Sequence, residues 1–213
     1  MKQVFGMTIP ESLTEICSPQ RCALMVYDMQ NGIVPQIPEG KSVVSRCGDL
    51  LEAARGSGMH VFFTRHFFLP IKSSGVGQLR RAMIWQRQPD LDKLGPLIPY
   101  GSKAWEIVPE LAPREGEVVI DKITMSAFES TFLNLALRDA HIDSFIIAGI
   151  ALEVGIEPTV RHGIDLNFIA VVAADACGSK SMEFHARSLA TMNETGEVIC
   201  CPVEDVLSAL RRD

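Results

Sequence analysis

Short apolar runs alternate with longer amphipathic segments along the whole chain. The runs are apolar at successive positions, which is typical of strands that are covered on both faces of a sheet. They predict strands at Cys22–Tyr27, His60–Thr64, Val118–Ile120, Phe145–Ala148, Phe168–Ala173 and Val198–Cys201. Helices are predicted at Val43–Ser57, Val76–Trp85, Phe128–Ala140, Ile156–Leu166, Ser181–Thr195 and Val203–Arg211. The alternation predicts an α/β fold in which helices cover both faces of a parallel sheet.

Length and composition are ordinary for a globular domain, and we expect residues 1–213 to form a single one. Hydrophobic residues make up 47% of the sequence and charged residues 22%, so a sizeable core can be buried without disulfides. The net charge is −6, and no cluster of Lys and Arg overrides it. Nucleic acid is therefore not an expected partner.

The cysteines and the apolar runs bear on the compartment. Six cysteines, at 17, 22, 47, 177, 200 and 201, contain no C-x-x-C pair, so neither a zinc site nor a redox pair is expected. The first residues lack the apolar run of a signal peptide, and no run approaches the ~20 apolar residues of a membrane helix. We expect a cytoplasmic protein with reduced thiols and no membrane partner.

Three polar features follow the predicted strands. Asp28 ends the first strand, Asp121-Lys122 ends the third, and the turn from Gly149 to Gly155 follows the fourth and leads into a helix. In open parallel sheets ligands bind at the carboxyl ends of the strands. Asp28 alone could cap a segment, and Lys122 alone could face solvent. Together with a helix N-terminus they are suited to acid–base chemistry with anion stabilisation.

Four segments of the sequence carry a family resemblance. They are ALMVYDMQNG (23–32), DKITMSAFESTFLNLALRD (121–139), AGIALEVGIEPTVRHG (148–163) and VVAADACGS (171–179). In this order they resemble the isochorismatase-like hydrolase superfamily, which includes nicotinamidases, N-carbamoylsarcosine amidases, biuret hydrolases and isochorismatases. The resemblance implies a three-layer α/β/α Rossmann-like sandwich with a six-stranded, mainly parallel sheet of order 3-2-1-4-5-6.

The resemblance also implies a site. It makes Asp28 and Lys122 catalytic, and it places Gly155 where the family usually carries a nucleophilic cysteine. A non-proline cis peptide bond is expected just before it, at Ala151–Leu152. The residues expected to bind substrate are Gln30, Arg65, His66, Trp85, Ala151, Leu152 and Glu153. Of these, Arg65 could hold a carboxylate or carbonyl, whereas His66 is either a substrate contact or a packed ring and Trp85 either lines the pocket or belongs to the core.

Glycine at position 155 excludes the family's covalent thioester step, because that step needs a thiolate. We therefore predict a hydrolase that acts on a small polar molecule by acid–base chemistry of Asp28 and Lys122, without a covalent cysteine intermediate. Two alternatives stay open. One is an amidohydrolase that cleaves the C–N bond of a ureide or carboxamide, because the N-terminal GMTIPESLTEI resembles the amidase and biuret branch. The other is an inactive homologue that binds a small ligand.

No metal and no cofactor are predicted. Some amidases of the family bind a divalent ion through paired histidines after the second strand, but FFTRHFFLP (62–70) contains only His66. The partner is a small-molecule substrate, and the resemblance implies a homo-oligomer, either a dimer or a tetramer. The long loop at 86–116 holds five prolines and is the candidate for completing the pocket of a neighbouring subunit.

Overall fold

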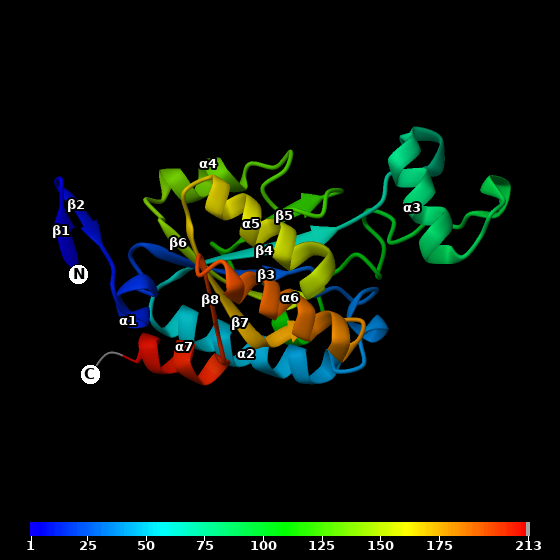
Figure 1. Ribbon diagram of the computed structural model, residues 1–213. Helices are drawn as coiled ribbons and strands as arrows, with labels where there is room; N and C mark the ends of the chain where they lie inside the picture. The colour runs from blue at the N-terminus through cyan, green and yellow to red at the C-terminus, as the bar shows by residue number, and fades with distance from the viewer. Residues whose placement is uncertain (212–213) are drawn as a thin grey trace.

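A six-stranded parallel sheet forms the centre of the computed structural model, which describes residues 1–211 (Figure 1). Its strands are β3 (Cys22–Tyr27), β4 (His60–His66), β5 (Val118–Lys122), β6 (Ser144–Ile150), β7 (Ile169–Gly178) and β8 (Val198–Cys201). They lie in the order β5-β4-β3-β6-β7-β8, and every neighbouring pair is parallel. Counted from β3, this is the predicted order 3-2-1-4-5-6, which is thereby confirmed.

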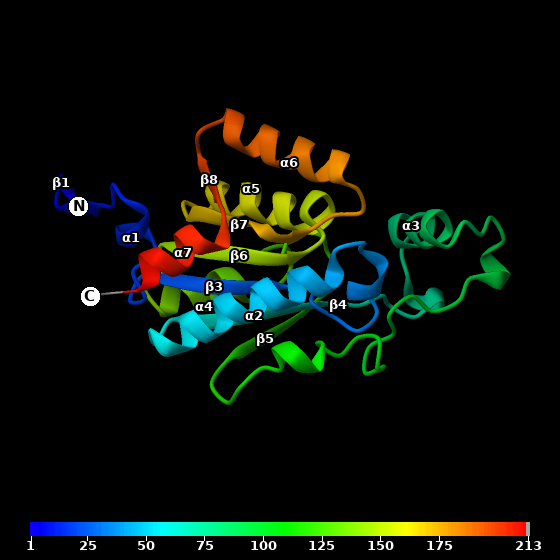
Figure 2. The same ribbon diagram turned by 90° about the horizontal axis from the view of Figure 1, so that it is seen from below.

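Helices cover both faces of the sheet, as the apolar pattern predicts (Figures 1 and 2). On one face lie α2 (Gly40–Gly56) and α7 (Val203–Leu210), and on the other lie α4 (Leu133–Asp139), α5 (Glu157–Asp165) and α6 (Met182–Glu194). Successive residues of β6 explain the continuous apolar run: Ile146 packs into the core on the α2 side and Ile147 into the core on the α4 side. Both faces of this strand are therefore buried.

The strands extend further towards their carboxyl ends than the apolar runs indicate. Backbone pairing of β4 and β5 continues through the pairs Arg65–Asp121 and His66–Lys122, although these side chains are polar. The helix predicted at Phe128–Ala140 is shorter at its start, because the chain turns through Ser130, whose φ is +58°, before α4 begins at Leu133. Polar residues at strand ends and tight turns thus lie together at the carboxyl ends of the strands.

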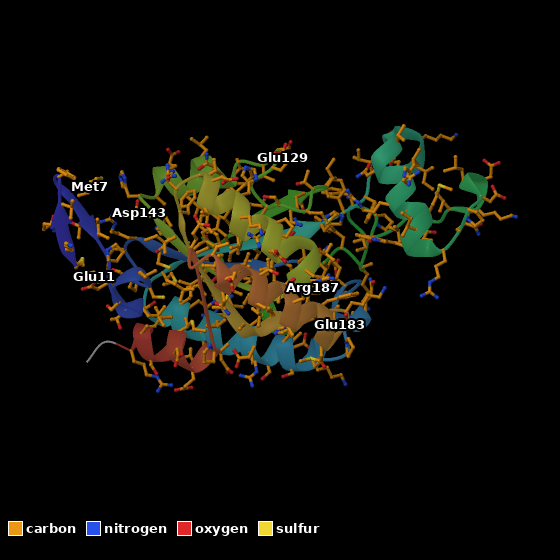
Figure 3. The ribbon with its side chains drawn as sticks, viewed as in Figure 1. Met7, Glu11, Glu129, Asp143, Glu183 and Arg187 are labelled. Carbon is orange, nitrogen blue, oxygen red and sulfur yellow. The ribbon has the colours of Figure 1, made fainter. Side chains whose placement is uncertain are left out.

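Two segments project from the opposite ends of the sandwich. At the amino ends of the strands, a hairpin of β1 (Lys2–Val4) and β2 (Met7–Ile9), followed by α1 (Leu13–Ile16), was not predicted from the sequence. Met7 and Asp143, which precedes β6, both lie at this end, away from α3 (Figure 3). At the other end, α3 (Val76–Gln86) stands away from the sheet.

Four short 3-10 helices also lie within residues 1–211. They are η1 (Val34–Gln36), η2 (Ile71–Ser73), η3 (Leu91–Lys93) and η4 (Pro109–Leu111). A further turn, η5 (Leu152–Ile156), is a π-helix that leads directly into α5. Among residues 1–211, no helix is both long enough and apolar enough to cross a membrane.

Candidate active site

A cavity of about 600 Å³ lies at the carboxyl ends of β3, β4 and β6. Its polar wall comes from strand ends and from the turn after β6, and its apolar wall comes from η1, α3 and the loop that follows α3. The residues around it are Tyr27, Asp28, Ile33, Gln36, Ile37, His66, Phe68, Ile84, Trp85, Arg87, Leu97, Ile98, Met125, Ile150, Ala151, Glu153, Val154, Gly155 and Lys180. Apolar walls with a few converging polar groups are typical of small-molecule sites.

The floor of this cavity holds a buried ion pair. Lys122 Nζ lies 2.6 Å from Asp28 Oδ2, and Thr64 Oγ1 donates a hydrogen bond of 2.5 Å to Asp28 Oδ1. Asp28 is 5% exposed and Lys122 3%. The ends of β3, β4 and β5 bring the three residues together, because these strands are neighbours in the sheet.

Burial changes the proton affinity of both partners. It raises the pKa of the Asp28 carboxyl, against the opposing effects of Lys122 and Thr64. It lowers the pKa of the Lys122 ammonium, against the opposing effect of Asp28. Desolvation disfavours the charged form of each group, so the pair is poised to exchange a proton more readily than exposed side chains would be.

The turn after β6 depends on two glycines. Gly149 has φ +134°, and a Cβ there would lie 2.9 Å from the backbone nitrogen of Tyr27 and closer still to its carbonyl oxygen. The cis peptide bond lies at Ile150–Ala151, so the expected position at Ala151–Leu152 was wrong by one residue. At Gly155 a Cβ would lie 2.5 Å from Cε1 of Tyr27 and closer still to its hydroxyl oxygen. The Tyr27 side chain therefore stands where a side chain at 155 would be.

His66 presents an unpaired nitrogen beside the cavity. Its Nε2 is buried and has no hydrogen-bond partner among the described residues. Burial above all, and then the positive charges of Lys122 and Arg81, lower the pKa of His66 from 6.5 to about 3. The imidazole is accordingly neutral at physiological pH, and its free nitrogen is available to a bound molecule.

Glu153 presents an unpaired oxygen on the other side of the cavity. Its Oε1 accepts a hydrogen bond of 3.1 Å from the backbone N–H of Lys180, while its buried Oε2 has no partner among residues 1–211. A buried carboxylate oxygen without a donor is costly in an empty site. A ligand with an N–H group pointing at Glu153 would satisfy it.

The structure gathers some of the expected residues around the cavity and not others. Asp28, His66, Trp85, Ala151, Glu153 and Gly155 line it, and Lys122 lies directly behind Asp28. Three residues expected to bind substrate lie elsewhere: Gln30, Arg65 and Leu152 are absent from the cavity wall.

Each of these three residues has a structural partner instead. Gln30 Nε2 donates to the carbonyl oxygens of His66 and Trp105, at 2.9 and 2.8 Å, and so fixes the loop beside β4. Arg65 forms a two-pronged ion pair with Asp121, at 2.8 and 2.9 Å. The Leu152 side chain is packed in the core below the turn.

Sequence reasoning missed Tyr27 and Lys180. Tyr27 is the last residue of an apolar run and reads as core, although it is the one residue of that run with a hydroxyl group. Phe68, two residues beyond the expected His66, also lines the cavity and packs edge-on against that ring. No signal in the sequence pointed to Lys180, which follows the carboxyl end of β7.

Cysteine and metal chemistry have no visible centre in this cavity. None of the six cysteines is among the residues that line it. Cys177 is buried in β7, and burial raises the pKa of its thiol well above 9. Within residues 1–211, no three His, Cys, Asp or Glu side chains stand close enough together to hold a metal ion.

A parallel sheet covered on both faces, with an acid, a lysine and a strand-to-helix turn at one edge, defines the class of isochorismatase-like α/β hydrolases. Residues 22–202 match the isochorismatase domain, and the chain belongs to this family. The ureidoacrylate amidohydrolase RutB of Klebsiella variicola is 32% identical over 184 residues, which cover 78% of this chain and 76% of the relative. The uncharacterized isochorismatase family protein YecD of Escherichia coli O157:H7 is 32% identical over 170 residues, covering 78% and 85%.

Solved structures agree with the fold. A cysteine hydrolase from Pseudomonas syringae pv. phaseolicola 1448A has a TM-score of 0.77 at 23% identity, covering 90% of this chain and 93% of the other. An isochorismatase family protein from Desulfovibrio vulgaris has a TM-score of 0.76 at 25% identity, covering 90% and 98%. This chain is therefore an isochorismatase-family hydrolase that carries glycine at position 155.

Proposed function

We propose that this hydrolase cleaves a small polar molecule by acid–base chemistry of Asp28 and Lys122, without a covalent cysteine intermediate. The observation that carries the proposal is the buried Asp28–Lys122 pair at the floor of a cavity that Gly155 lines and no cysteine does. A positioned carboxylate of raised pKa is suited to take a proton from an attacking water near neutral pH. Lys122 stabilises the carboxylate before the proton is taken.

The C–N bond of a ureide or carboxamide is the bond class that the relatives favour, because several are named ureidoacrylate amidohydrolase. Water would attack the carbonyl carbon while Asp28 accepts its proton, and that proton would then pass to the departing nitrogen. The unpaired Oε2 of Glu153 supports the same class, since ureides and carboxamides carry N–H donors. We propose that Glu153 accepts such a donor.

An enol ether is the second candidate, supported by the direction of the Asp28 pKa. Burial favours the protonated carboxyl, and a protonated carboxyl can donate to the carbon of an enol ether before water adds to the oxocarbenium centre. This reaction also requires no thiol. The two candidates differ in which species of Asp28 begins the reaction, so their rates should depend on pH in opposite directions around the pKa of Asp28.

Turnover of a panel of carboxamides, ureides and enol ethers tests the proposal. The Asp28→Asn variant is the control, because it keeps the size of the side chain and removes its acid–base function. We expect the variant to lose about 10²–10⁴ of the rate, the usual contribution of a positioned proton donor or acceptor. Turnover that is independent of Asp28, or binding of panel compounds without any turnover, would contradict it.

A further inference from the structure

Tyr27 fills the place that a nucleophilic side chain at position 155 would take. We propose that Tyr27 is a catalytic residue of this site: its hydroxyl replaces the missing side chain and donates a hydrogen bond to the carbonyl oxygen of the substrate. The contact with substrate rests on the proposed function, whereas the occupation of the position by the phenol does not. The two parts are therefore tested separately.

The overlap with position 155 is steric and specific. A Cβ on Gly155 would lie 2.5 Å from Cε1 and 2.6 Å from Cζ of Tyr27, distances that real side chains do not tolerate. By contrast, a Cβ on Gly48 of α2 would meet its nearest neighbour, Leu111, only at 3.9 Å. Tyrosine at 27, in this conformation, therefore requires glycine at 155.

Contacts on several sides fix the phenol in this place. Tyr27 ends β3 and is buried, and its hydroxyl donates a hydrogen bond to the backbone carbonyl of Met125. Lys122 Nζ lies 4.2 Å from the centroid of its ring, a favourable cation–π distance. The catalytic lysine is therefore held between the Asp28 carboxylate and the Tyr27 ring.

The phenol is a neutral donor at this position. Burial, and then the charge of Asp28, raise the pKa of Tyr27 well above 10. A neutral hydroxyl aimed at a carbonyl oxygen stabilises the negative charge that develops there when water attacks the carbon. No bond to Tyr27 forms in this step: the hydroxyl exchanges the Met125 carbonyl for the substrate oxygen and keeps its proton.

A double-mutant cycle tests whether Tyr27 occupies the position, without any need for a substrate. Gly155→Cys is made in the wild-type protein and in the Tyr27→Val variant, and the unfolding equilibrium constant is measured with denaturant. We expect Gly155→Cys to destabilise the wild type at least about tenfold more than it destabilises Tyr27→Val, because the two residues compete for one space. Gly48→Cys is the matched control and should cost the same in both backgrounds.

Alkylation of the introduced thiol adds a second readout to the cycle. Mass spectrometry after iodoacetamide treatment should find the thiol at position 155 modified much faster in the Tyr27→Val background, where the cavity reaches it. Equal costs and equal alkylation rates of Gly155→Cys in the two backgrounds would overturn the assignment of Tyr27 to this position.

Tyr27→Phe tests the hydroxyl, because it keeps the ring and removes only the oxygen. On a panel compound that the wild type hydrolyses, we expect kcat to fall about 10²–10³-fold, the loss typical of one hydrogen-bond donor to a developing oxyanion, with a smaller change in KM. Unchanged kcat in Tyr27→Phe together with an inactive Asp28→Asn would overturn the role of Tyr27 alone. The proposed function would be overturned if activity survives in Asp28→Asn, or if the wild type hydrolyses no panel compound. The contact between Tyr27 and substrate would then fall with it. The double-mutant cycle would still decide whether the phenol occupies the position of a side chain at 155.

Discussion

Two residues in this protein, His66 and Glu153, carry buried polar atoms that suggest where a ligand binds. His66 Nε2 and Glu153 Oε2 are both buried without a hydrogen-bond partner in the described residues, and both residues line the same cavity. Each such atom costs stability in the empty protein. The cost is understandable where a bound molecule satisfies them, and these two atoms are the ones of this kind, among the described residues, that belong to the cavity wall.

The buried imidazole of His66 should make stability depend on pH. Its pKa is depressed from 6.5 in the unfolded chain to about 3 in the fold, so its contribution to stability is present above pH 6.5 and is lost as the pH falls towards 3. We expect the wild type to lose about 1.2 kcal/mol more stability than His66→Phe between pH 6 and pH 5. Denaturant unfolding at several pH values measures this, with the exposed His60→Gln as control. Parallel curves for wild type and His66→Phe would contradict it.

Glu153→Gln should weaken substrate binding more than catalysis. The substitution keeps the shape of the side chain but removes the negative charge that faces the cavity. We expect KM to rise about tenfold or more, the usual effect of losing a hydrogen bond to a charged group, with a smaller change in kcat. Glu157→Gln is the matched control, because Glu157 pairs with Arg161 at 2.8 Å and lies outside the cavity wall. An equal effect of both substitutions would count against contact between Glu153 and the substrate.

The Lys122→Met substitution should lower the free energy of unfolding, because it removes one partner of the buried ion pair. Without the ammonium, the Asp28 carboxylate is buried without a counter-charge and keeps only the hydrogen bond from Thr64, so we expect a loss of about 3–5 kcal/mol in the free energy of unfolding at pH 8. The loss should be smaller at pH 5, because a carboxyl of raised pKa is then protonated in the fold. The double variant Asp28→Asn/Lys122→Met should recover part of the stability. A loss that does not change with pH would show that Asp28 is not left charged.

Strands and helices were predictable to different extents, for identifiable reasons. Runs such as Cys22–Tyr27 coincide with their strands because both faces are buried, but β4 continues past its apolar run through Arg65 and His66. Those two residues pair with β5 through their backbones, and hydropathy does not register backbone pairing. Likewise the first turn of the predicted 128–140 helix is lost to a tight turn at Ser130, which periodicity does not detect.

The same reasoning separates the predictable part of the site from the rest. Asp28 and Lys122 stand at polar strand ends, where the fold class alone leads one to look. Tyr27 could not be found in this way, because its proposed role depends on how closely β3 approaches the turn after β6. Arg65 was assigned to substrate because of its charge, but its carboxylate partner, Asp121, belongs to the neighbouring strand.

The projecting helix α3 should take part in assembly. Ile84 is 65% exposed and Tyr100, in the loop that follows α3, is 63% exposed, while Trp85 of the same helix reaches the cavity wall. Exposed apolar side chains on a projecting segment are typical of an interface, and a second copy of the chain would cover them. We expect a dimer or tetramer by light scattering at micromolar concentration, and a shift towards monomer for Ile84→Glu. A monomeric wild type would contradict this.

At the scale of the whole molecule, the sheet brings distant parts of the chain together at the carboxyl ends of its strands. Residues 28, 66 and 153 come from three different segments and line one cavity, and residue 122, from a fourth segment, pairs with Asp28 behind the cavity wall. None of the six cysteines is among the residues that line that cavity. Hydrolysis at this edge should therefore depend on the acid and be independent of the cysteines.

Turnover measured before and after treatment with iodoacetamide, in the wild type and in Asp28→Asn, tests this dependence most directly. We expect alkylation of the accessible cysteines to leave the rate of the wild type largely unchanged. Asp28→Asn should lower the rate about 10²–10⁴-fold in variant protein that circular dichroism shows to be folded. Loss of all turnover on alkylation, with the modification mapped by mass spectrometry to Cys177, would contradict the proposal, because a thiol would then be the nucleophile.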